Sequence, residues 1–273
     1  MKGFDYASLA DYHLHTPLCR HAEGWPVEYA RAARELGLAE IGFADHSPMA
    51  QPFDDWRMLL EELPRYFEAV EEARAAFPGL PIRLGLEVDY LEGQEEWIAK
   101  LAGMAEWDFL IGSVHYVTPD WAIDNPAHIS RYNDRPLEEI WALYWKTLEK
   151  AIRSRAFDFI GHADLPKKFG HRLPGNEGER RRMLDPVIRA LAETGTAIEI
   201  NTAGLRKPIG ECYPTLEFLT LAREAGIDLL LNSDAHAPAE VGAGFAEGVQ
   251  LAREAGYTQL VRFEKRKKRH VAL

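Results

Sequence analysis

Histidine and carboxylate residues in this sequence gather in short groups, each placed at the end of, or within, a stretch apolar enough to be a buried strand. The groups contain His13, His15 and His21, then Asp45 with His46, Glu87, His115, His162 with Asp164, and Asp234 with His236. Imidazole and carboxylate ligands without thiolates match divalent metals such as zinc, manganese and iron. The pattern therefore indicates a metal site assembled from residues far apart in the sequence.

Spacing within these groups adds a geometric constraint. Side chains two residues apart on a strand project from the same side, so His13 can act together with His15, and the last group has the same spacing. Asp45 and His46 are adjacent and would point in opposite directions. We therefore expect His46 to be a ligand and Asp45 to support it or handle protons. Glu87 stands inside an apolar stretch, where a carboxylate without a cation would be costly.

The elements that must position these groups can be predicted from hydrophobic periodicity. The predicted strands are Leu9–His13, Glu40–Ala44, Ile82–Val88, Phe109–Val114, Phe157–Gly161, Ala197–Asn201 and Asp228–Asn232. The predicted helices are Val27–Leu36, Arg57–Phe77, Leu137–Arg155, Arg180–Glu193, Thr215–Ala225 and Ala239–Ala255. We expect Pro64 to break or kink the second helix, and residues 119–135 to form a long polar loop.

Strands that alternate with helices are typical of a parallel sheet with crossover helices. Seven such units in 273 residues favour an α/β fold, a closed or nearly closed (β/α) barrel. A doubly wound open sheet is the alternative, but the sequence lacks the GxGxxG and GxxxxGK[ST] motifs of its nucleotide-binding forms. In a barrel all the strand ends open on one face, so the groups would converge there. We expect residues 1–273 to form a single domain.

Composition narrows the classes of function. The formal net charge is −11, and the stretch from Arg262 to Arg269 is locally basic, with Glu264 as its one acidic residue. An acidic body disfavours nucleic acid as a partner, although the basic stretch leaves a small exception open. No apolar run approaches the ~18–20 residues that cross a bilayer, so we expect no membrane span. Cys19 and Cys212 form no CxxC motif, and we expect a cytoplasmic protein.

In their order along the chain, the groups resemble the ligand pattern of the polymerase and histidinol phosphatase (PHP) superfamily, over nearly the whole sequence. Four longer strings are similar to those of monofunctional histidinol-phosphate phosphatases: residues 85–90, 111–116, 162–169 and 201–208. The resemblance implies a distorted (β/α)7 barrel with its metal site at the C-terminal face of the strands. It also implies a phosphoric monoester hydrolase that converts L-histidinol phosphate to L-histidinol and phosphate in histidine biosynthesis.

The resemblance further implies three divalent transition-metal ions, which zinc, iron or manganese would supply. The first ion would be held by His13, His15, Glu87 and Asp234, the second by Glu87, His115 and His162, and the third by His21, His46 and His236. No position of this pattern is substituted in the chain. Cys19, between two of these histidines, is interpreted as a packing residue.

A multinuclear site can neutralise a phosphoryl group and activate water for attack on it. We expect Glu87, Asp45, Asp234 and His236 to take part in catalysis, with Asp45 relaying a proton to the leaving group. Arg206 is the preferred phosphate clamp, because a guanidinium binds phosphate through two parallel hydrogen bonds. Lys167 and Lys168 are secondary candidates. The substrate amine and imidazole could be received by Glu23, Asp45, Asp89, Asp164 or Glu211, among which the sequence does not choose.

Two other functions compete with a small phosphate monoester as the substrate. A PHP-type phosphoesterase could act on nucleotides or short nucleic acid, but it would need a basic, aromatic-lined groove. A non-enzymatic PHP module of a polymerase would be expected to lose ligands. The sequence favours neither.

Overall fold

Seven parallel strands form the centre of the molecule, as the sequence predicts. In the computed structural model, which describes residues 4–273, they lie in the order β1, β2, β3, β4, β7, β8, β9. Their bounds are β1 Ala10–Leu14, β2 Glu40–Phe43, β3 Ile82–Asp89, β4 Phe109–Ser113, β7 Phe159–Ile160, β8 Ala197–Asn201 and β9 Leu229–Asn232. The amide of His15 donates to the carbonyl of Ala235, and the amide of Ala235 to that of His13, each at 3.0 Å. The two edges of the sheet therefore meet, and the fold is an α/β barrel of seven strands.

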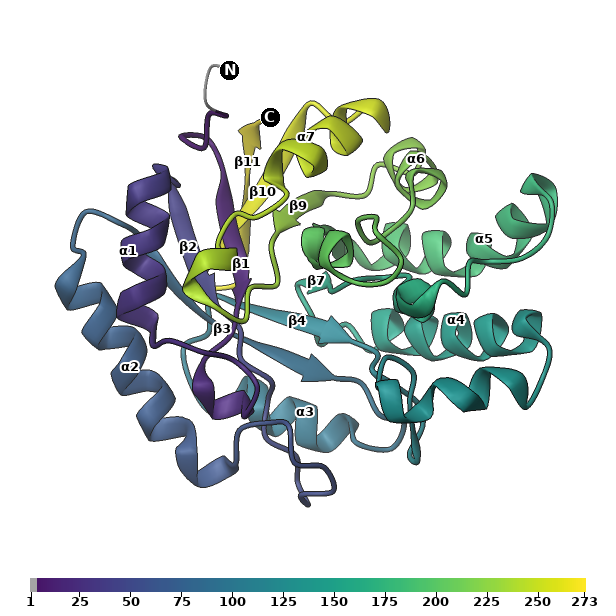
Figure 1. The fold of residues 1–273 in the computed structure, drawn as a ribbon, viewed down its shortest axis with the longest axis horizontal. Coiled ribbons are helices and arrows are strands. Elements are labelled where there is room, and N and C mark those ends of the chain that lie inside the picture. Colours follow the sequence, from purple (N-terminus) through teal and green to yellow (C-terminus); the bar gives the residue numbers. More distant parts are fainter. Residues whose placement is uncertain (1–3) are drawn as a thin grey trace.

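Helices surround this barrel (Figure 1). They are α1 Pro26–Leu36, α2 Leu63–Ala76, α3 Glu95–Ala102, α4 Leu137–Arg153, α5 Glu177–Thr194, α6 Leu216–Glu224 and α7 Phe245–Glu254. The predicted helix Arg57–Phe77 is interrupted near Pro64, because a 3₁₀ helix covers Leu60–Glu62 and α2 begins at Leu63. Pro64 does not kink α2, because it lies in the first turn, where a missing N–H costs nothing. Helix α3 was not predicted. No helix of the described chain is both long and apolar enough to span a bilayer.

Residues 119–135 contain more structure than the predicted polar loop. Strands β5, Tyr116–Thr118, and β6, Trp121–Ala122, form a short hairpin, and a 3₁₀ helix covers Pro126–Asn133. Five other 3₁₀ helices connect elements within the described chain: Pro17–Cys19, Leu60–Glu62, Leu165–Phe169, Thr202–Arg206 and Pro238–Glu240. Most of these lie just after a barrel strand, so they shape the loops that carry the ligand groups.

Aromatic rings fill the barrel interior near the amino ends of the strands. Phe109 contacts Tyr12 and Phe159, with ring centroids 5.1 and 5.6 Å apart. A Cβ at Gly85 would lie 2.4 Å from the Phe109 ring, so a glycine is required there for the ring to fit. Phe263 stacks on Phe159, with centroids 5.9 Å apart. The barrel is therefore solid at this end.

Phe263 belongs to a hairpin, whereas the sequence indicated only a basic stretch there. Strands β10, Gln259–Glu264, and β11, Lys267–Ala272, pair antiparallel and cap the amino end of the barrel. The basic side chains pair with carboxylates there: Arg266 with Asp158 at 2.8 Å, and Lys268 with Asp228 at 2.7 Å. Because these cations are paired with carboxylates, the basic stretch is less available to bind nucleic acid than its sequence alone suggests. That residues 1–273 form one domain stays a prediction, and residues 1–3 lie outside the described residues.

Candidate metal centre

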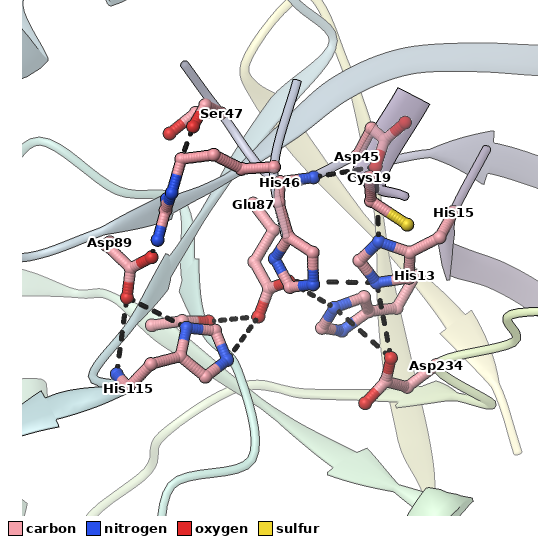
Figure 2. Close-up of polar contacts among 12 residues, drawn as sticks. His13, His15, Cys19, Asp45, His46, Ser47, Glu87, Asp89, His115 and Asp234 are labelled. Atoms are coloured by element: carbon pink, nitrogen blue, oxygen red, sulfur yellow. Dashed lines mark hydrogen bonds and ion pairs between the residues drawn. The ribbon is translucent and has the colours of Figure 1, made fainter. Parts of the chain in front are cut away.

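The strand ends bring all nine predicted ligands to one cluster at the carboxyl end of the barrel (Figure 2 shows part of it). These residues are His13, His15, His21, His46, Glu87, His115, His162, Asp234 and His236. Most are buried, and His13 and His15 have no exposed surface at all. His21 is the exposed member, at the outer rim. The convergence predicted from the sequence is thus a feature of the structure.

Glu87 lies at the centre of this cluster, and its two carboxylate oxygens face different histidines. Oε2 lies 3.3 Å from Nε2 of His13 and 3.7 Å from Nε2 of His15. Oε1 lies 2.9 Å from Nε2 of His162 and 3.5 Å from Nε2 of His115. Such a carboxylate can bridge two cations, one on each oxygen. This is the arrangement that the first two implied ligand groups require.

Asp234 completes the first of these groups. Its Oδ1 lies 3.2 Å from Nε2 of His15 and 3.8 Å from Nε2 of His13. Asn201 donates to the other oxygen of Asp234 at 3.1 Å, which fixes the carboxylate. The two histidines two positions apart at the end of β1 therefore do act on one site.

His21, His46 and His236 form the third group, with ligand atoms within 4.8 Å of one another. The division between groups is not sharp, because Nδ1 of His46 also lies 2.8 Å from Oε2 of Glu87, although the two atoms are not oriented for a hydrogen bond. Cys19, interpreted from the sequence as a packing residue, belongs to the edge of this cluster. It is fully buried, and its sulfur lies within 4.8 Å of a ring nitrogen of His15 and of His236. Hydrogen bonds with His15 and His21 lower the pKa of its thiol, although burial alone would raise it.

Carboxylates behind the histidines fix the orientation of the rings. Nδ1 of His13 lies 3.1 Å from both oxygens of Glu199, and Nδ1 of His115 lies 2.8 Å from Oδ1 of Asp89. Arg57 in turn contacts Asp89 at 2.9 Å. A histidine bound on one nitrogen by a carboxylate presents the other nitrogen as a better metal ligand. Both rings therefore direct Nε2 toward Glu87.

Several buried polar atoms of the cluster have no hydrogen-bond partner among the described residues. They are Nε2 of His13, both ring nitrogens of His15, Nδ1 of His46, Oε2 of Glu87, Nδ1 of His162 and Nε2 of His236. Leaving buried polar groups unpaired costs about 1–3 kcal/mol each. Nitrogen and oxygen atoms of this kind, grouped around two carboxylates, fit divalent transition-metal ions.

The electrostatics of the cluster divide its histidines into two sets. Burial alone would lower the pKa of His13 and His15, but nearby carboxylates hold both well above the ordinary value, and Asp89 and Glu87 raise the pKa of His115 to about 9. Burial lowers the pKa of His46 to about 4, against the opposing effect of Glu87. Burial and the nearby His15 hold the pKa of His236 well below its ordinary value. Burial alone would raise the pKa of Glu87, but His46, His13 and His115 keep it well below its usual range. The carboxylates thus stabilise positive charge at the centre, whether it is carried by a protonated imidazole or by a metal ion that displaces the proton.

Two ligands have an unusual backbone. His162 and Asp234 have φ angles of 27° and 51°, in the left-handed region that non-glycine residues rarely adopt. The amide of His162 donates to Oε1 of Glu199 at 2.9 Å, which helps to hold that conformation. Such strain persists where the surrounding structure determines it, commonly at functional sites.

Asp45 lies behind His15, away from the cavity. Its Oδ1 accepts from the amide of His46 at 2.9 Å and lies 3.5 Å from Nδ1 of His15, while Oδ2 binds the hydroxyl of Thr16. The side chain is fully buried. This placement agrees with the expected supporting position. Asp45 does not belong to the described cavity lining, and its part in proton transfer stays a prediction.

The predicted cations differ in where they point. A cavity of about 440 Å³ opens over the cluster, lined by Lys168 and Lys207 among other residues. Arg206 is outside this lining, because its guanidinium donates to the carbonyls of Ser233 and Asp234 at 2.9 and 3.2 Å. Lys167 is buried against the carbonyl of Cys212 and the carboxylate of Asp164. Of the three predicted phosphate-binding residues, the structure brings Lys168 alone to the cavity.

None of the five acidic residues proposed for the substrate amine belongs to the described cavity lining. The carboxylates there are Asp55 and Asp124, together with the ligands Glu87 and Asp234. Asp124 accepts from Lys168 at 2.8 Å. Sequence reasoning also missed Glu199 and Arg57, and it noted Lys207 only as the neighbour of Arg206 in a cationic stretch. Glu199 had a usable signal, since it is a carboxylate inside an apolar strand, as Glu87 is.

The family model described as the PHP domain matches residues 11–203. The chain belongs to the PHP domain family. The matched range contains seven of the nine ligands, and Asp234 and His236 lie beyond it.

PHP relatives cover almost the full length of the chain. A probable histidinol-phosphatase of Deinococcus radiodurans is 46% identical, over 91% of this chain and 94% of that protein. A histidinol-phosphatase of Bacillus subtilis is 29% identical, over 86% and 96%. Among solved structures, the histidinol phosphate phosphatase of Lactococcus lactis, crystallised with zinc, L-histidinol and phosphate, superimposes with a TM-score of 0.83. It is 25% identical, over 96% of this chain and 99% of that chain.

Proposed function

We propose that this PHP protein is a metal-dependent histidinol-phosphatase, which hydrolyses L-histidinol phosphate to L-histidinol and phosphate. The observation that carries the reaction class is the position of Glu87 between two sets of histidines, with one oxygen toward each. Support for the substrate comes from the Deinococcus relative and from the Lactococcus structure that holds L-histidinol and phosphate.

Three ions of zinc, iron or manganese fit the cluster. His13, His15, Glu87 and Asp234 would hold the first, Glu87, His115 and His162 the second, and His21, His46 and His236 the third. When bound, such ions supply positive charge at the phosphoryl group and the Lewis acidity that hydrolysis of a phosphate monoester requires.

Residues of the chain prepare the cavity for this chemistry. The hydroxyl of Ser113 donates to Oε1 of Glu87 at 2.6 Å and holds the central carboxylate in place. Arg206 acts on the ligand loop rather than on phosphate, because it binds the carbonyls of Ser233 and Asp234. Lys207, which has no ion-pair partner in the described chain, supplies the free cation at the mouth for an incoming phosphate.

The far end of the substrate carries an amine and an imidazole. Asp55 and Asp124 are the carboxylates of the cavity outside the ligand set, and Trp56 provides an aromatic surface beside them. A cationic amine is attracted to carboxylates while the centre attracts the phosphate, so a small monoester with a cationic tail matches both ends. A volume of about 440 Å³ is in the range of small-molecule sites.

A comparison of substrates tests the proposal. We expect kcat/KM for histidinol phosphate to exceed that for p-nitrophenyl phosphate by at least ~10-fold, because the latter loses the amine contacts. A higher kcat/KM for a mononucleotide or an oligonucleotide would overturn the assignment of histidinol phosphate as the substrate. Hydrolysis of a phosphate ester would then remain as the reaction class. Elemental analysis of gently purified protein should give close to three metal ions per chain, and full activity in a chelator would contradict metal dependence.

A further inference from the structure

Glu199, in strand β8, is a carboxylate of the barrel interior whose contacts reach two of the ligand groups. Its side chain has no exposed surface. It contacts the ring of His13 on β1 and the backbone of His162, which follows β7. These two histidines would hold different ions, the first and the second. One side chain therefore lies where it can support both.

Both oxygens of Glu199 accept hydrogen bonds, and every partner is a donor. Oε1 receives the amide of His162 at 2.9 Å and the side-chain amide of Asn201 at 2.8 Å. Oε2 receives the side-chain amide of Asn232 at 2.7 Å. Nδ1 of His13 lies 3.1 Å from each oxygen, and it carries the ring proton when Nε2 binds an ion. A glutamine would turn its NH₂ group toward at least one of these donors, so the position requires a carboxylate.

Asn201 extends these contacts to another ligand of the first ion. Its side-chain nitrogen donates to Oε1 of Glu199 and, at 3.1 Å, to Oδ2 of Asp234. Its oxygen accepts from the amide of Ala203 at 3.0 Å, so the nitrogen is the end that faces the two carboxylates. Glu199 thus reaches His13 directly and Asp234 through one amide.

The turn that carries His162 is built against the same carboxylate. A Cβ at the preceding Gly161 would lie 2.7 Å from Oγ of Ser113 and 3.5 Å from Oε1 of Glu199, so a glycine lets the backbone lie close to both. Ser113 binds Oε1 of Glu87, the oxygen that also lies 2.9 Å from Nε2 of His162. Glu199 therefore helps to set where this imidazole meets the central carboxylate.

Charge distinguishes Glu199 from Asp89, the carboxylate behind His115. Asp89 is paired with Arg57 at 2.9 Å. Glu199 has no lysine or arginine partner in the described chain, where its ion-pair contact is with His13. A buried carboxylate without a cation is costly. The charge of Glu199 is therefore balanced only by positive charge at the metal centre, on His13 or on an ion at its Nε2.

From these contacts we propose that Glu199 is a positioning residue shared by the first two ions. It orients His13 and, through Asn201, the carboxylate of Asp234 for the first ion. It also holds the turn that places His162 at the second. The third ion is independent of Glu199, because no ligand of its group contacts this carboxylate in the described chain. The inference rests on the metal dependence of the proposed function and not on the identity of the substrate.

Retention of zinc by Glu199→Gln tests the shared role. Each protein is dialysed against zinc buffered over a range of free concentrations, and elemental analysis counts the ions per chain. We expect the variant to need ~10–100-fold more free zinc than the parent protein to retain two of its ions, and the same free zinc for the other. Glu40→Gln is the matched control, because Glu40 is equally buried in a strand but pairs with Arg83, and it should follow the parent at every concentration.

Two results with Glu199→Gln would overturn the proposal. A shift in the retention of a single ion would confine Glu199 to one site. Retention equal to that of the parent, with a lower melting temperature of the metal-free protein, would assign Glu199 to stability alone. The visible absorption of the cobalt-loaded protein reports ligand geometry, and it should change in Glu199→Gln but not in Glu40→Gln.

Asn201→Ser provides a second, milder test, and it decides the matter if Glu199→Gln does not fold. Serine keeps an oxygen that can cap the 3₁₀ helix Thr202–Arg206, and it removes the amide between Glu199 and Asp234. We expect the retention of one ion to weaken about 5-fold. Retention equal to that of the parent would overturn the proposal. A parent protein that retained no ion would overturn the proposed function as well, whereas retention that the variants leave unchanged would overturn this inference alone.

Discussion

The two ends of the barrel use buried charge in opposite ways. At the amino end, Glu40 is 1% exposed and is met by Arg83 at 2.6 Å, Arg269 at 3.1 Å and the hydroxyl of Tyr12. At the carboxyl end, Glu87 is equally buried but is surrounded by histidines, and its Oε2 has no hydrogen-bond partner in the described chain. One carboxylate is neutralised by the protein, and the other is left for a cation that the protein does not supply.

This difference separates stability from function. The hairpin β10–β11 closes the amino end with apolar residues and pairs its cations with carboxylates at the starts of strands. The carboxyl end retains unpaired polar atoms and strained backbone at His162 and Asp234. The same substitution at the two ends should therefore damage different properties.

Glu87→Gln should have a larger effect than any other substitution at either end. The change removes the charge from the carboxylate shared by two ligand groups, so we expect kcat/KM to fall by roughly three orders of magnitude or more. Metal content, measured by elemental analysis, should fall as well. Thermal unfolding of the metal-free protein should change little. Near-normal turnover and metal content would show that Glu87 does not bridge.

Glu40→Gln is the matched change at the other end. It leaves Arg83 and Arg269 facing an uncharged amide, and breaking a buried ion pair costs ~3–5 kcal/mol when both partners are buried. Because Arg269 is half exposed, we expect the free energy of unfolding to fall by about 2–3 kcal/mol. Urea unfolding measures the loss. Since Glu40 is far from the cavity, kcat/KM under native conditions should stay within about twofold of that of the parent protein. A loss of kcat/KM comparable to that of Glu87→Gln would show that buried charge at the amino end does not serve stability alone.

The carboxyl end could be predicted from sequence more fully than the amino end. The histidines and carboxylates at successive strand ends can be recognised by residue type, and the seven strands can be predicted from their apolar runs. The hairpin was missed because β11 lies on the edge of a two-stranded sheet with mostly exposed side chains, so Lys267 to Arg269 resemble a solvated tail. Its pairing partners, such as Asp158, are distant in sequence and have no recognisable spacing.

Side-chain direction in loops was the other limit. Arg206 and Lys207 are adjacent, and their types favoured Arg206 as the phosphate clamp, but the fold directs its guanidinium to the carbonyls of the Asp234 loop. Arg57 had no sequence signal, because its role depends on Asp89 more than thirty residues away. Helix α3 has only eight residues, too few for its period to be clear.

Asp89→Asn sharpens the comparison, because Asp89 is a carboxylate at the functional end whose charge the protein itself compensates. Its Oδ2 forms an ion pair with Arg57 and its Oδ1 lies against Nδ1 of His115, so its loss should act through the metal ligand. We expect kcat/KM to fall about 10–100-fold with weaker metal retention during dialysis. Asp120→Asn, at an exposed carboxylate paired with Arg131, is the control. A lower melting temperature with unchanged kinetics and metal content would assign Asp89 to stability alone.

Lys268→Ala should give the smallest effect, confined to the amino end and dependent on pH. Burial alone would raise the pKa of Asp228, but hydrogen bonds from Lys268 and His270 hold it below its ordinary value. A carboxylate with a lowered folded-state pKa stabilises the protein above its ordinary pKa, and this contribution is lost as the pH falls and the group is protonated. We expect the variant to lose about 0.5–1 kcal/mol at pH 7, because the pair is partly exposed. The deficit should shrink as the pH falls below about 4 and disappear only below the lowered pKa of Asp228, where the group is protonated in both proteins. Urea unfolding of both proteins in matched buffers measures it. A deficit as large at about pH 3 as at pH 7 would show that Lys268 acts through its contact with the carbonyl of Gly195 rather than through Asp228.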